Sequence, residues 1–252
     1  MKRIIAIANQ KGGVGKTTTA INLAACIAEL GHKVLLVDLD PQGNATTGLG
    51  INKSEQEYNV YNLILGKCTA KQAVVHTELR NLDLIPSNVS LAAAEIELID
   101  AKNKENRLKE ELDYIQDDYD YVLIDCPPSL SMLTINAMTT ADSVLVPIQC
   151  EYYALEGLSQ LMYTIDLIQE RLNDHLTVDG IVFTMYDSRT NLSADVVKNV
   201  KENLDVPIYD TIIPRNIRLA EAPSYGQPIN LYDARSTGAA AYKELAAEVT
   251  GK

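Results

Sequence analysis

A glycine-rich segment between a predicted strand and a predicted helix constrains the fold of this chain more than any other feature. The apolar run 4–8 predicts a β-strand, and the stretch 17–30 is patterned as a helix. The residues at positions 10–18 read Gln-Lys-Gly-Gly-Val-Gly-Lys-Thr-Thr. Glycine adopts backbone angles closed to other residues, so successive N–H groups can turn inward and cradle phosphate oxygens. Because the dipole of the following helix adds positive charge there, the segment is predicted to be a phosphate-binding loop.

Three side chains of this loop have the chemistry that phosphate binding requires. Lys16 would supply a positive charge to the β- and γ-phosphates of a nucleotide, and the hydroxyl of Thr17 could ligate Mg²⁺. Thr18 could donate a hydrogen bond to the α-phosphate.

The loop departs from the usual pattern at two neighbouring positions. A glycine ordinarily stands at the place of Gln10, and Lys11 is a second lysine where one suffices. Lys11 therefore has no assigned role inside its own subunit, and we expect it to serve a facing one. The alternative is a chance motif with a solvated Lys11, which the agreement of strand, loop and helix disfavours.

Short apolar runs alternate with helix-like segments along the chain. This order predicts an α/β fold, a mostly parallel β-sheet flanked by helices on both faces, with ligands at the carboxyl ends of the strands. With 46% hydrophobic residues, the whole chain, 1–252, is expected to form a single domain. The predicted strands are Arg3–Asn9, Lys33–Asp38, Leu82–Pro86, Tyr121–Asp125, Ser143–Pro147, Gly180–Thr184 and Ile208–Ile213. The predicted helices are Thr17–Leu30, Ser90–Ile99, Leu130–Thr140, Leu155–Asn173, Ser193–Asn203 and Gly238–Val249.

Composition excludes several classes of protein. The four cysteines form no Cys-x-x-Cys pair, which argues against a zinc ribbon or a disulfide scaffold and favours the reducing cytosol. The apolar run after Met1-Lys2-Arg3 is too short for a signal peptide or a membrane span. The net charge of −12 comes from the middle of the chain, where residues 61–185 hold 8 basic and 20 acidic side chains. The acidic stretch 105–120 is expected to be a solvated helix and turn.

Carboxylates follow two of the predicted strands. The second strand is followed by Asp38-Leu39-Asp40-Pro41-Gln42-Gly43-Asn44, in which Pro41 and Gly43 predict a turn. A carboxylate at this strand end could orient an attacking water or hold hydrated Mg²⁺, although an ordinary turn with capping aspartates is the alternative. The run Tyr121–Asp125 has the form of a Walker B strand, whose aspartate reaches Mg²⁺ through water. Thr17 and Asp125 are therefore expected to share one Mg²⁺.

The ordered motifs resemble the deviant Walker A ATPases of the ParA/MinD family, and most closely their chromosomal ParA, or Soj, branch. The resemblance covers almost the whole chain and implies the P-loop NTPase fold of the deviant Walker A type. Besides residues 11–18, it rests on residues 38–44, 124–128, 147–157 (Pro-Ile-Gln-Cys-Glu-Tyr-Tyr-Ala-Leu-Glu-Gly), 213–216 (Ile-Pro-Arg-Asn) and 221–223 (Glu-Ala-Pro).

The resemblance implies an ATP-sandwich homodimer in which Lys11 reaches the phosphates bound by the partner. Asp40 would position the hydrolytic water, Asp125 would hold Mg²⁺ through water, and Gly12 would permit close approach of the subunits, whereas Asp38 is a weaker assignment. Hydrolysis would be slow until a ParB-like centromere-binding protein stimulates it, because a missing transition-state charge or a misplaced water costs roughly 10³ to 10⁵ in rate. The implied ATP contacts in the loop are Lys11, Gly12, Gly13, Val14, Gly15, Lys16, Thr17 and Thr18.

The adenine contacts implied by the resemblance lie late in the chain. Pro214 and Asn216 are similar to residues that enclose adenine in this branch, and Met185 would pack on the ring. A simple strand-ending loop explains the same residues equally well, since proline and asparagine are common in turns.

The resemblance also implies non-specific binding of double-stranded DNA by the dimer, through basic residues that face phosphates. Arg189 and Arg218 match positions where this branch carries DNA-contacting arginines, and Lys198, Lys201 and Arg215 could assist them. The protein is then expected in the cytoplasm, associated with the nucleoid. The alternative is scattered solvated charge, because residues 186–252 carry 8 basic and 9 acidic side chains.

Other modes of action within the family are disfavoured. A MinD-like membrane switch needs a C-terminal amphipathic helix, but residues 238–252 are rich in alanine and poor in cationic charge. No N-terminal helix-turn-helix domain is expected, since the phosphate loop begins ten residues into the sequence. A metal-cluster carrier related to the nitrogenase iron protein would need suitably facing cysteines, and Cys126 does not match that ligand pattern.

Overall fold

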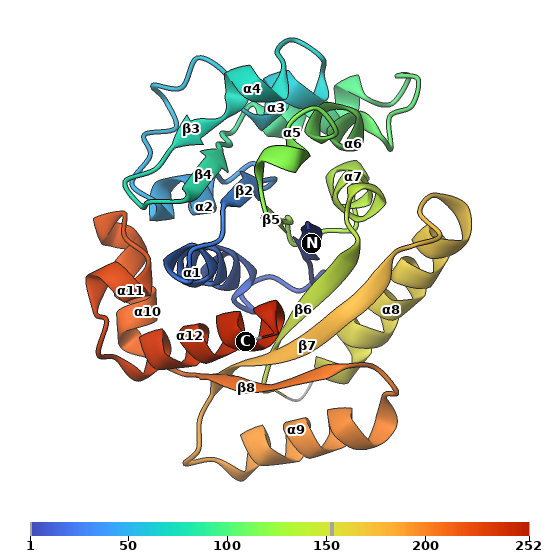
Figure 1. Ribbon diagram of the computed structural model, residues 1–252. Helices are drawn as coiled ribbons and strands as arrows, with labels where there is room; N and C mark the ends of the chain where they lie inside the picture. Colours follow the sequence, from blue (N-terminus) through green and yellow to red (C-terminus); the bar gives the residue numbers. More distant parts are fainter. Residues whose placement is uncertain (1, 152–153, 252) are drawn as a thin grey trace.

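The computed structural model describes residues 2–151 and 154–251 and, of residues 154–156, only the backbone. An eight-stranded sheet in the order β3-β4-β2-β5-β1-β6-β7-β8 runs through its centre (Figure 1). All neighbouring strands are parallel except β3 and β4 at one edge, so the predicted mostly parallel sheet is confirmed. The strands are β1 (Arg3–Ile7), β2 (Val34–Asp38), β3 (Val75–His76), β4 (Leu82–Ile85), β5 (Tyr121–Asp125), β6 (Ser143–Gln149), β7 (Thr177–Tyr186) and β8 (Ile208–Pro214).

Both faces of the sheet are buried, which explains why its strands are almost continuously apolar. Successive side chains of β1 point to opposite faces, so Ile4 and Ala6 join one hydrophobic core while Ile5 and Ile7 join the other. Each fully buried isoleucine side chain stabilises the fold by about 1.5–3 kcal/mol. The core with Ile5 is covered by α1 (Lys16–Glu29) and α12 (Thr237–Thr250), which pack against each other (Figure 1).

The helices of the opposite face complete the second core. They include α7 (Met132–Thr140), α8 (Ala154–Arg171) and α9 (Asn191–Asn203), all three close to their predicted ranges. The predicted helix at 90–99 is α5 (Leu91–Glu97), and the acidic stretch 105–120 holds α6 (Arg107–Leu112) and a short 3₁₀ helix, η1 (Gln116–Asp118). The short elements without a sequence prediction are β3, α2 (Asn44–Gly48), α3 (Val60–Ile64), α4 (Ala70–Ala73), α10 (Ile217–Glu221), η2 (Ala222–Tyr225) and α11 (Ile229–Tyr232).

The strand register brings the predicted phosphate loop and carboxylates to one edge of the sheet. In β5, Asp125 pairs with Ile7 of β1 on one side and with Asp38 of β2 on the other. The loop after β1, the turn after β2 and the end of β5 therefore meet at the carboxyl edge, where a parallel sheet binds ligands.

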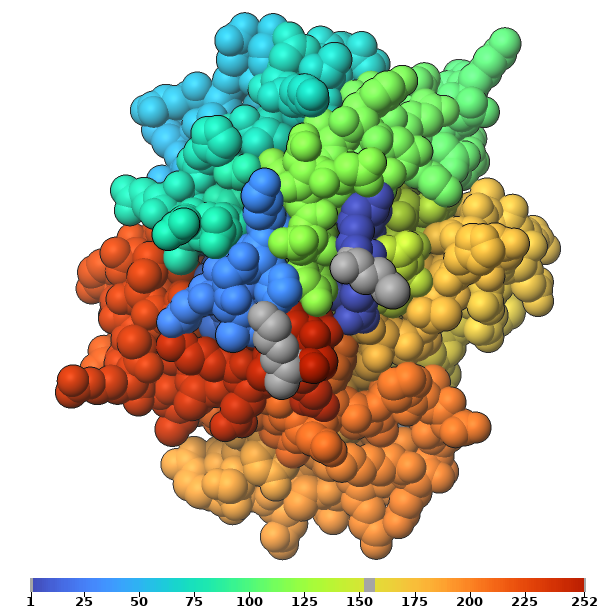
Figure 2. Space-filling model, in the orientation of Figure 1, coloured from blue at the N-terminus to red at the C-terminus, as the bar shows by residue number. Residues whose placement is uncertain are grey.

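The opposite edge of the sheet is where the two ends of the described chain meet. Figure 2 shows the first residues of β1, in dark blue, beside the end of α12, in red. Arg3 Nη1 donates a hydrogen bond of 2.7 Å to the carbonyl of Val249 there. Within the described residues, no helix combines the length and the apolar character needed to span a membrane.

Candidate nucleotide-binding site

The loop between β1 and α1 has the conformation of a phosphate cradle. Gly13 and Gly15 have φ angles of 75° and 88°, in the left-handed region that favours glycine. Gly15 is also the N-cap of α1, so the loop turns directly into the positive end of that helix. The hydroxyl of Thr184, at the end of β7, donates 2.8 Å to the carbonyl of Val14 and holds the loop from the side. This contact could not be predicted from the sequence, because Thr184 lies 170 residues away from Val14 along the chain.

Lys16 lies inside the loop, as its predicted role requires. The residue is only 6% exposed, and its Nζ donates 2.9 Å to the carbonyl of Lys11. Burial lowers the pKa of Lys16, while the carboxylates of Asp125 and Asp40 act in the opposite direction. The ammonium is thus held beside two carboxylates with most of its water removed, where its charge acts strongly on a bound anion.

Asp125 is the group in the site that most needs a cation. It is fully buried, and neither carboxylate oxygen accepts a hydrogen bond of normal geometry from a described residue, although the Thr17 hydroxyl is near enough to affect the pKa of Asp125. Burial, followed by the nearby charge of Asp38, raises the pKa of Asp125 well above its ordinary value, while the Thr17 hydroxyl and the Lys16 ammonium oppose the rise. Buried carboxylates normally pair with charges or metals, so the donor set of Thr17 and Asp125 fits hydrated Mg²⁺.

Asp38 serves mainly to hold the turn that follows β2. One oxygen accepts hydrogen bonds from the backbone N–H and the hydroxyl of Thr46, at 2.8 and 2.7 Å, and the other accepts from the N–H of Asp40 at 3.3 Å. The Thr46 hydroxyl also accepts from the N–H of Ser87, and the Ser87 hydroxyl donates 2.7 Å to the carbonyl of Asp40. This network fixes the backbone of Asp40 and leaves Asp38 little capacity for a ligand, in keeping with its weaker sequence assignment.

Asp40 lines a groove over the phosphate loop. Its carboxylate accepts 2.9 Å from the N–H of Gln42, and the residue is 8% exposed. The groove has a volume of about 320 Å³. Its lining residues are Gly13, Gly15, Lys16, Thr17, Thr18, Asp40, Gln42, Asn44, Pro128 and Met185. The structure therefore gathers Lys16, Thr17 and Asp40 around one space, whereas Asp125 is fully buried and is not among the residues that line it.

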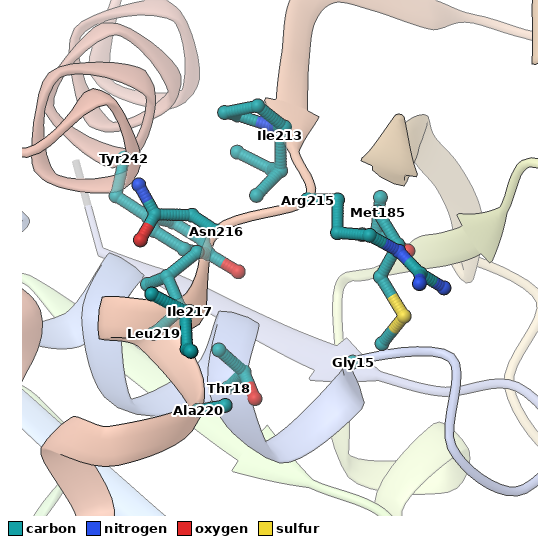
Figure 3. Close-up of a pocket in the computed structure, with 12 residues that line it drawn as sticks. Gly15, Thr18, Met185, Ile213, Arg215, Asn216, Ile217, Leu219, Ala220 and Tyr242 are labelled. Carbon is teal, nitrogen blue, oxygen red and sulfur yellow. The ribbon is translucent and has the colours of Figure 1, made fainter. Parts of the chain in front are cut away.

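A second cavity of about 400 Å³ continues this groove, since Gly15, Thr18 and Met185 line both. Figure 3 shows side chains of β8, α10 and α12 converging on it above the start of α1. Its other lining residues are Thr184, Ile213, Pro214, Arg215, Asn216, Ile217, Leu219, Ala220 and Tyr242. An apolar cavity that opens onto a phosphate groove has the shape and chemistry for the base of a nucleotide.

The three predicted adenine residues all line this second cavity. Met185 has a φ of 52°, unusual for a residue with a side chain, and stands over Gly15 in Figure 3. The oxygen of the Asn216 side chain accepts from the N–H of Arg218, and its nitrogen donates to the Thr237 hydroxyl, both at 2.8 Å. Asn216 thus caps α10 and ties it to α12. Their contact with adenine stays a prediction.

Lys11 and Gly12, the predicted dimer residues, differ in their contacts within their own chain. The expectation that Lys11 is idle in its own subunit is wrong, because its ammonium forms an ion pair with Glu151. Gly12 has no left-handed φ, and a Cβ there would meet only Pro128 Cβ, at 3.9 Å. The described chain has room for a side chain at Gly12, so any need for glycine arises outside it.

The predicted DNA contacts lie beyond two adjacent strands, Arg189 in a turn and Arg218 in α10, and each has an acidic partner. Arg189 follows β7 and Arg218 follows β8, two strands that are paired up to Tyr186 and Pro214. Arg189 donates to both carboxylate oxygens of Asp187, at 2.8 and 2.6 Å. Arg218 contacts Glu221 at 2.9 Å and Asp233 at 3.5 Å. Of the possible helpers, Lys198 lies 3.8 Å from Glu202, and Lys201 and Arg215 are exposed.

The cysteines do not form a metal centre. Cys26, Cys68, Cys126 and Cys150 are buried and unpaired in disulfides, and burial raises the pKa of each thiol. In the part of the chain that the structure describes, no group of three or more His, Cys, Asp or Glu side chains could hold a metal directly. Mg²⁺ bound by Thr17 and water needs no such group.

Comparison with known proteins agrees with this geometry. A family model described as an AAA domain matches residues 2–178. The chain is 55% identical over 249 residues to the sporulation initiation inhibitor protein Soj of Bacillus subtilis, covering 99% of this chain and 98% of that protein. It is 51% identical over 252 residues to the chromosome partitioning protein ParA of Caulobacter vibrioides, covering 99% of this chain and 94% of that protein.

A solved structure resembles both the sequence and the fold. Cobyrinic acid a,c-diamide synthase from Mycobacterium smegmatis, with bound ADP and magnesium, superposes with a TM-score of 0.88 at 39% identity, covering 100% of this chain and 97% of that chain. The sheet, the deviant phosphate loop and the near full-length identities to Soj and ParA lead to one conclusion. The chain belongs to the ParA/MinD family of deviant Walker A ATPases, in its ParA/Soj branch.

Proposed function

We propose that this protein is an ATPase that partitions chromosomal or plasmid DNA. With ATP and Mg²⁺ it forms a homodimer that binds double-stranded DNA without sequence preference, and ATP hydrolysis releases it. The observation that carries the proposal is the buried carboxylate of Asp125, which lacks a hydrogen bond of normal geometry among the described residues and acts on the charge of Lys16. Lys16 lines a groove that continues into a cavity fit for a base. The names and identities of the Soj and ParA relatives support the biological role.

The phosphate groove supplies the parts that hydrolysis needs. When bound, Mg²⁺ would neutralise charge on the β- and γ-phosphates. Thr17 provides a hydroxyl for the metal, Asp125 holds one of its waters, and Asp40 orients the attacking water from the turn after β2. Among the described residues that line the groove, Lys16 is the one cation, and with Lys11 of the facing subunit it would balance the charge of the transition state only in part. A ParB-like partner therefore raises a slow basal rate, by roughly 10³ to 10⁵ if it acts as an arginine finger does.

The dimer is proposed to form across the phosphate loops. Lys11 lies at the outer end of the loop, with its side chain 37% exposed, and reaches the phosphates of the facing subunit. Gly12 has room for a side chain within its own chain, which supports a requirement for glycine set by the facing subunit. ATP then controls assembly, because its phosphates lie between the subunits and attract the lysines of both.

DNA binding is assigned to Arg189 and Arg218. Both side chains are more than half exposed and follow adjacent strands, so two subunits would present four arginines to the phosphates of a duplex. With DNA as its ligand, the protein would act in the cytoplasm, associated with the nucleoid. A membrane switch of the MinD type is less well supported, since Tyr242, Leu245 and Val249 of α12 are buried in the core and leave no large apolar face for lipid.

The test is retention of the protein on non-specific double-stranded DNA with ATP, ADP or no nucleotide, at low and physiological salt. We expect retention with ATP only, lost in Lys16→Ala. Arg189→Ala and Arg218→Ala should keep nucleotide binding and lose most of the retention, with a smaller salt dependence. Arg80→Ala, at an exposed arginine between β3 and β4, is the control and should behave as wild type. Retention that is unchanged in both arginine variants would refute the DNA assignment, and no retention in any state would refute the DNA switch.

A further inference from the structure

Of the two residues at which the phosphate loop departs from the usual pattern, Lys11 binds the segment between β6 and α8, and Gln10 binds the first half of α8. The ammonium of Lys11 pairs with the carboxylate of Glu151. The side-chain amide of Gln10 donates 2.9 Å to the carbonyl of Gly157 and 2.7 Å to the side-chain oxygen of Gln160. The unusual end of the loop is thus bound to a distant part of the chain, since these two hydrogen bonds join residues 147 and 150 positions apart.

Lys11 is held at its backbone as well as at its side chain. Its N–H donates a hydrogen bond of 3.0 Å to the side-chain oxygen of Asn9. The side-chain nitrogen of Asn9 donates a hydrogen bond of 2.8 Å to the carbonyl of Pro147 in β6. The carbonyl of Lys11 accepts the bond from Lys16 Nζ. Since the backbone of Lys11 is fixed on both sides, the direction of its ammonium depends chiefly on the contact with Glu151.

The ion pair is more sheltered than most charges on this surface. The side chains of Lys11 and Glu151 are 37% and 32% exposed, so each is about two-thirds covered. Charges in such positions are screened less by water and salt than fully exposed ones. The pair therefore contributes more to the preferred position of Lys11 than an exposed surface pair would.

We infer that Glu151 is a positioning residue that retains Lys11 within its own subunit and opposes formation of the ATP dimer. This inference rests on the proposed function, in which Lys11 binds the phosphates of the facing subunit. One ammonium does not make full contact with both anions, so Lys11 leaves Glu151 when the dimer forms. The dimer then carries a partly buried Glu151 without its partner, which shifts the equilibrium toward the monomer.

Removal of the charge at Glu151 should therefore tighten the dimer. The measurement is the monomer–dimer dissociation constant by sedimentation velocity with Mg²⁺ and a non-hydrolysable ATP analogue, which separates assembly from hydrolysis. We expect Glu151→Gln to lower the constant by roughly threefold to tenfold, the range of a partly screened ion pair. Glu170→Gln makes the same charge change at an exposed position near the end of α8 and should have little effect.

Two further variants separate the possible explanations. Lys11→Ala should abolish the dimer. Glu151→Asp keeps the charge on a shorter side chain, so it should tighten the dimer less than Glu151→Gln, and it remains informative if the glutamine variant does not fold. A merely structural role for Glu151 predicts weaker dimers in its variants, whereas this inference predicts tighter ones.

The outcomes distinguish this inference from the proposed function. If Lys11→Ala abolishes the dimer but the Glu151 variants match wild type or weaken it, the role of Glu151 is refuted and the dimer stands. If the wild type does not dimerise with the analogue, or if Lys11→Ala dimerises normally, both the proposed dimer and the role of Glu151 are refuted.

Discussion

Asp125 shows how a single residue can report a ligand. Its carboxylate is fully buried, and its oxygens accept no hydrogen bond of normal geometry from the described residues. A buried unsatisfied polar group costs about 1–3 kcal/mol, and more if it is charged. Asp125→Asn should therefore leave the nucleotide-free protein at least as stable as wild type, while abolishing the extra stability that Mg²⁺ adds to ADP binding. Thermal midpoints with and without Mg²⁺ and ADP test this, with the exposed Asp174→Asn as control. An undiminished Mg²⁺ effect in Asp125→Asn would remove the residue from the metal site.

Asp187 is expected to weaken DNA binding by occupying Arg189. The carboxylate accepts both the Nε–H and an Nη–H of that arginine, whose side chain is 83% exposed. Asp187→Asn should tighten DNA binding and steepen its salt dependence by up to about one phosphate contact per subunit. Fluorescence anisotropy with a labelled duplex across a salt series measures both quantities.

The control for this prediction is Asp195→Asn, which removes one exposed charge from the nearby α9. If the two variants tighten binding equally, overall charge rather than release of Arg189 is responsible.

At the scale of single residues, the sequence predicted the positions that depend only on near neighbours along the chain. Lys16 and Thr17 lie in the groove because a glycine loop followed by a helix places them there. Glu151 was not predicted as the partner of Lys11, since their contact depends on how β6 lies beside β1. The acidic partners of Arg189 and Arg218 were missed although they are only two and three residues away, because charge counts do not show side-chain direction.

Among the elements, α2 links the end of β2 to the turn that holds Asp40, and the link is the side chain of Thr46. The Thr46 hydroxyl donates a hydrogen bond to the Asp38 carboxylate and accepts one from the N–H of Ser87. The hydroxyl of Ser87 in turn donates a hydrogen bond to the carbonyl of Asp40. Thr46→Val keeps the shape of the side chain but removes both bonds. We expect a loss of about 1–3 kcal/mol in the free energy of unfolding and a lower rate of hydrolysis with ADP binding retained. Denaturant unfolding, a phosphate-release assay and ADP titration measure these three quantities.

The neighbouring Thr47→Val is the matched control, because the Thr47 hydroxyl bonds only within α2 and its N-cap, to Gly43. Equal loss of hydrolysis in both variants would mean that α2 as a whole, rather than the Thr46 network, positions the turn.

The long elements were predictable for a physical reason that the short ones lack. Strands buried on both faces, such as β1, β2 and β5, appear as continuous apolar runs. Helices of four to six residues, such as α2 and α10, complete at most two turns and show no clear periodicity. The network around Asp38 and the walls of the base cavity depend on these short helices, so the sequence did not reveal them.

For the whole molecule, Gly12 tests whether function requires a second subunit. A Cβ at this position meets nothing closer than Pro128 Cβ, at 3.9 Å, within the described chain, so we expect Gly12→Val to fold and to bind ADP. If the phosphate loops of two subunits face each other, the added side chain prevents their approach and abolishes the dimer with a non-hydrolysable ATP analogue. Light scattering after size-exclusion chromatography measures this, and the smaller Gly12→Ala should show a weaker defect. Normal dimers of Gly12→Val would place the interface elsewhere.

The packing of α12 against α1 links the two ends of the chain in the nucleotide site. Tyr242 of α12 lines the base cavity, and its hydroxyl lies 3.1 Å from that of Thr19 in α1. During synthesis on the ribosome, the phosphate loop emerges early, but the cavity beside it has no complete wall until α12 has followed. Contacts between the base and the protein can therefore stabilise the fold fully only once translation has passed α12, so truncated products should gain less protection from cellular ATP against proteolysis than the whole chain does.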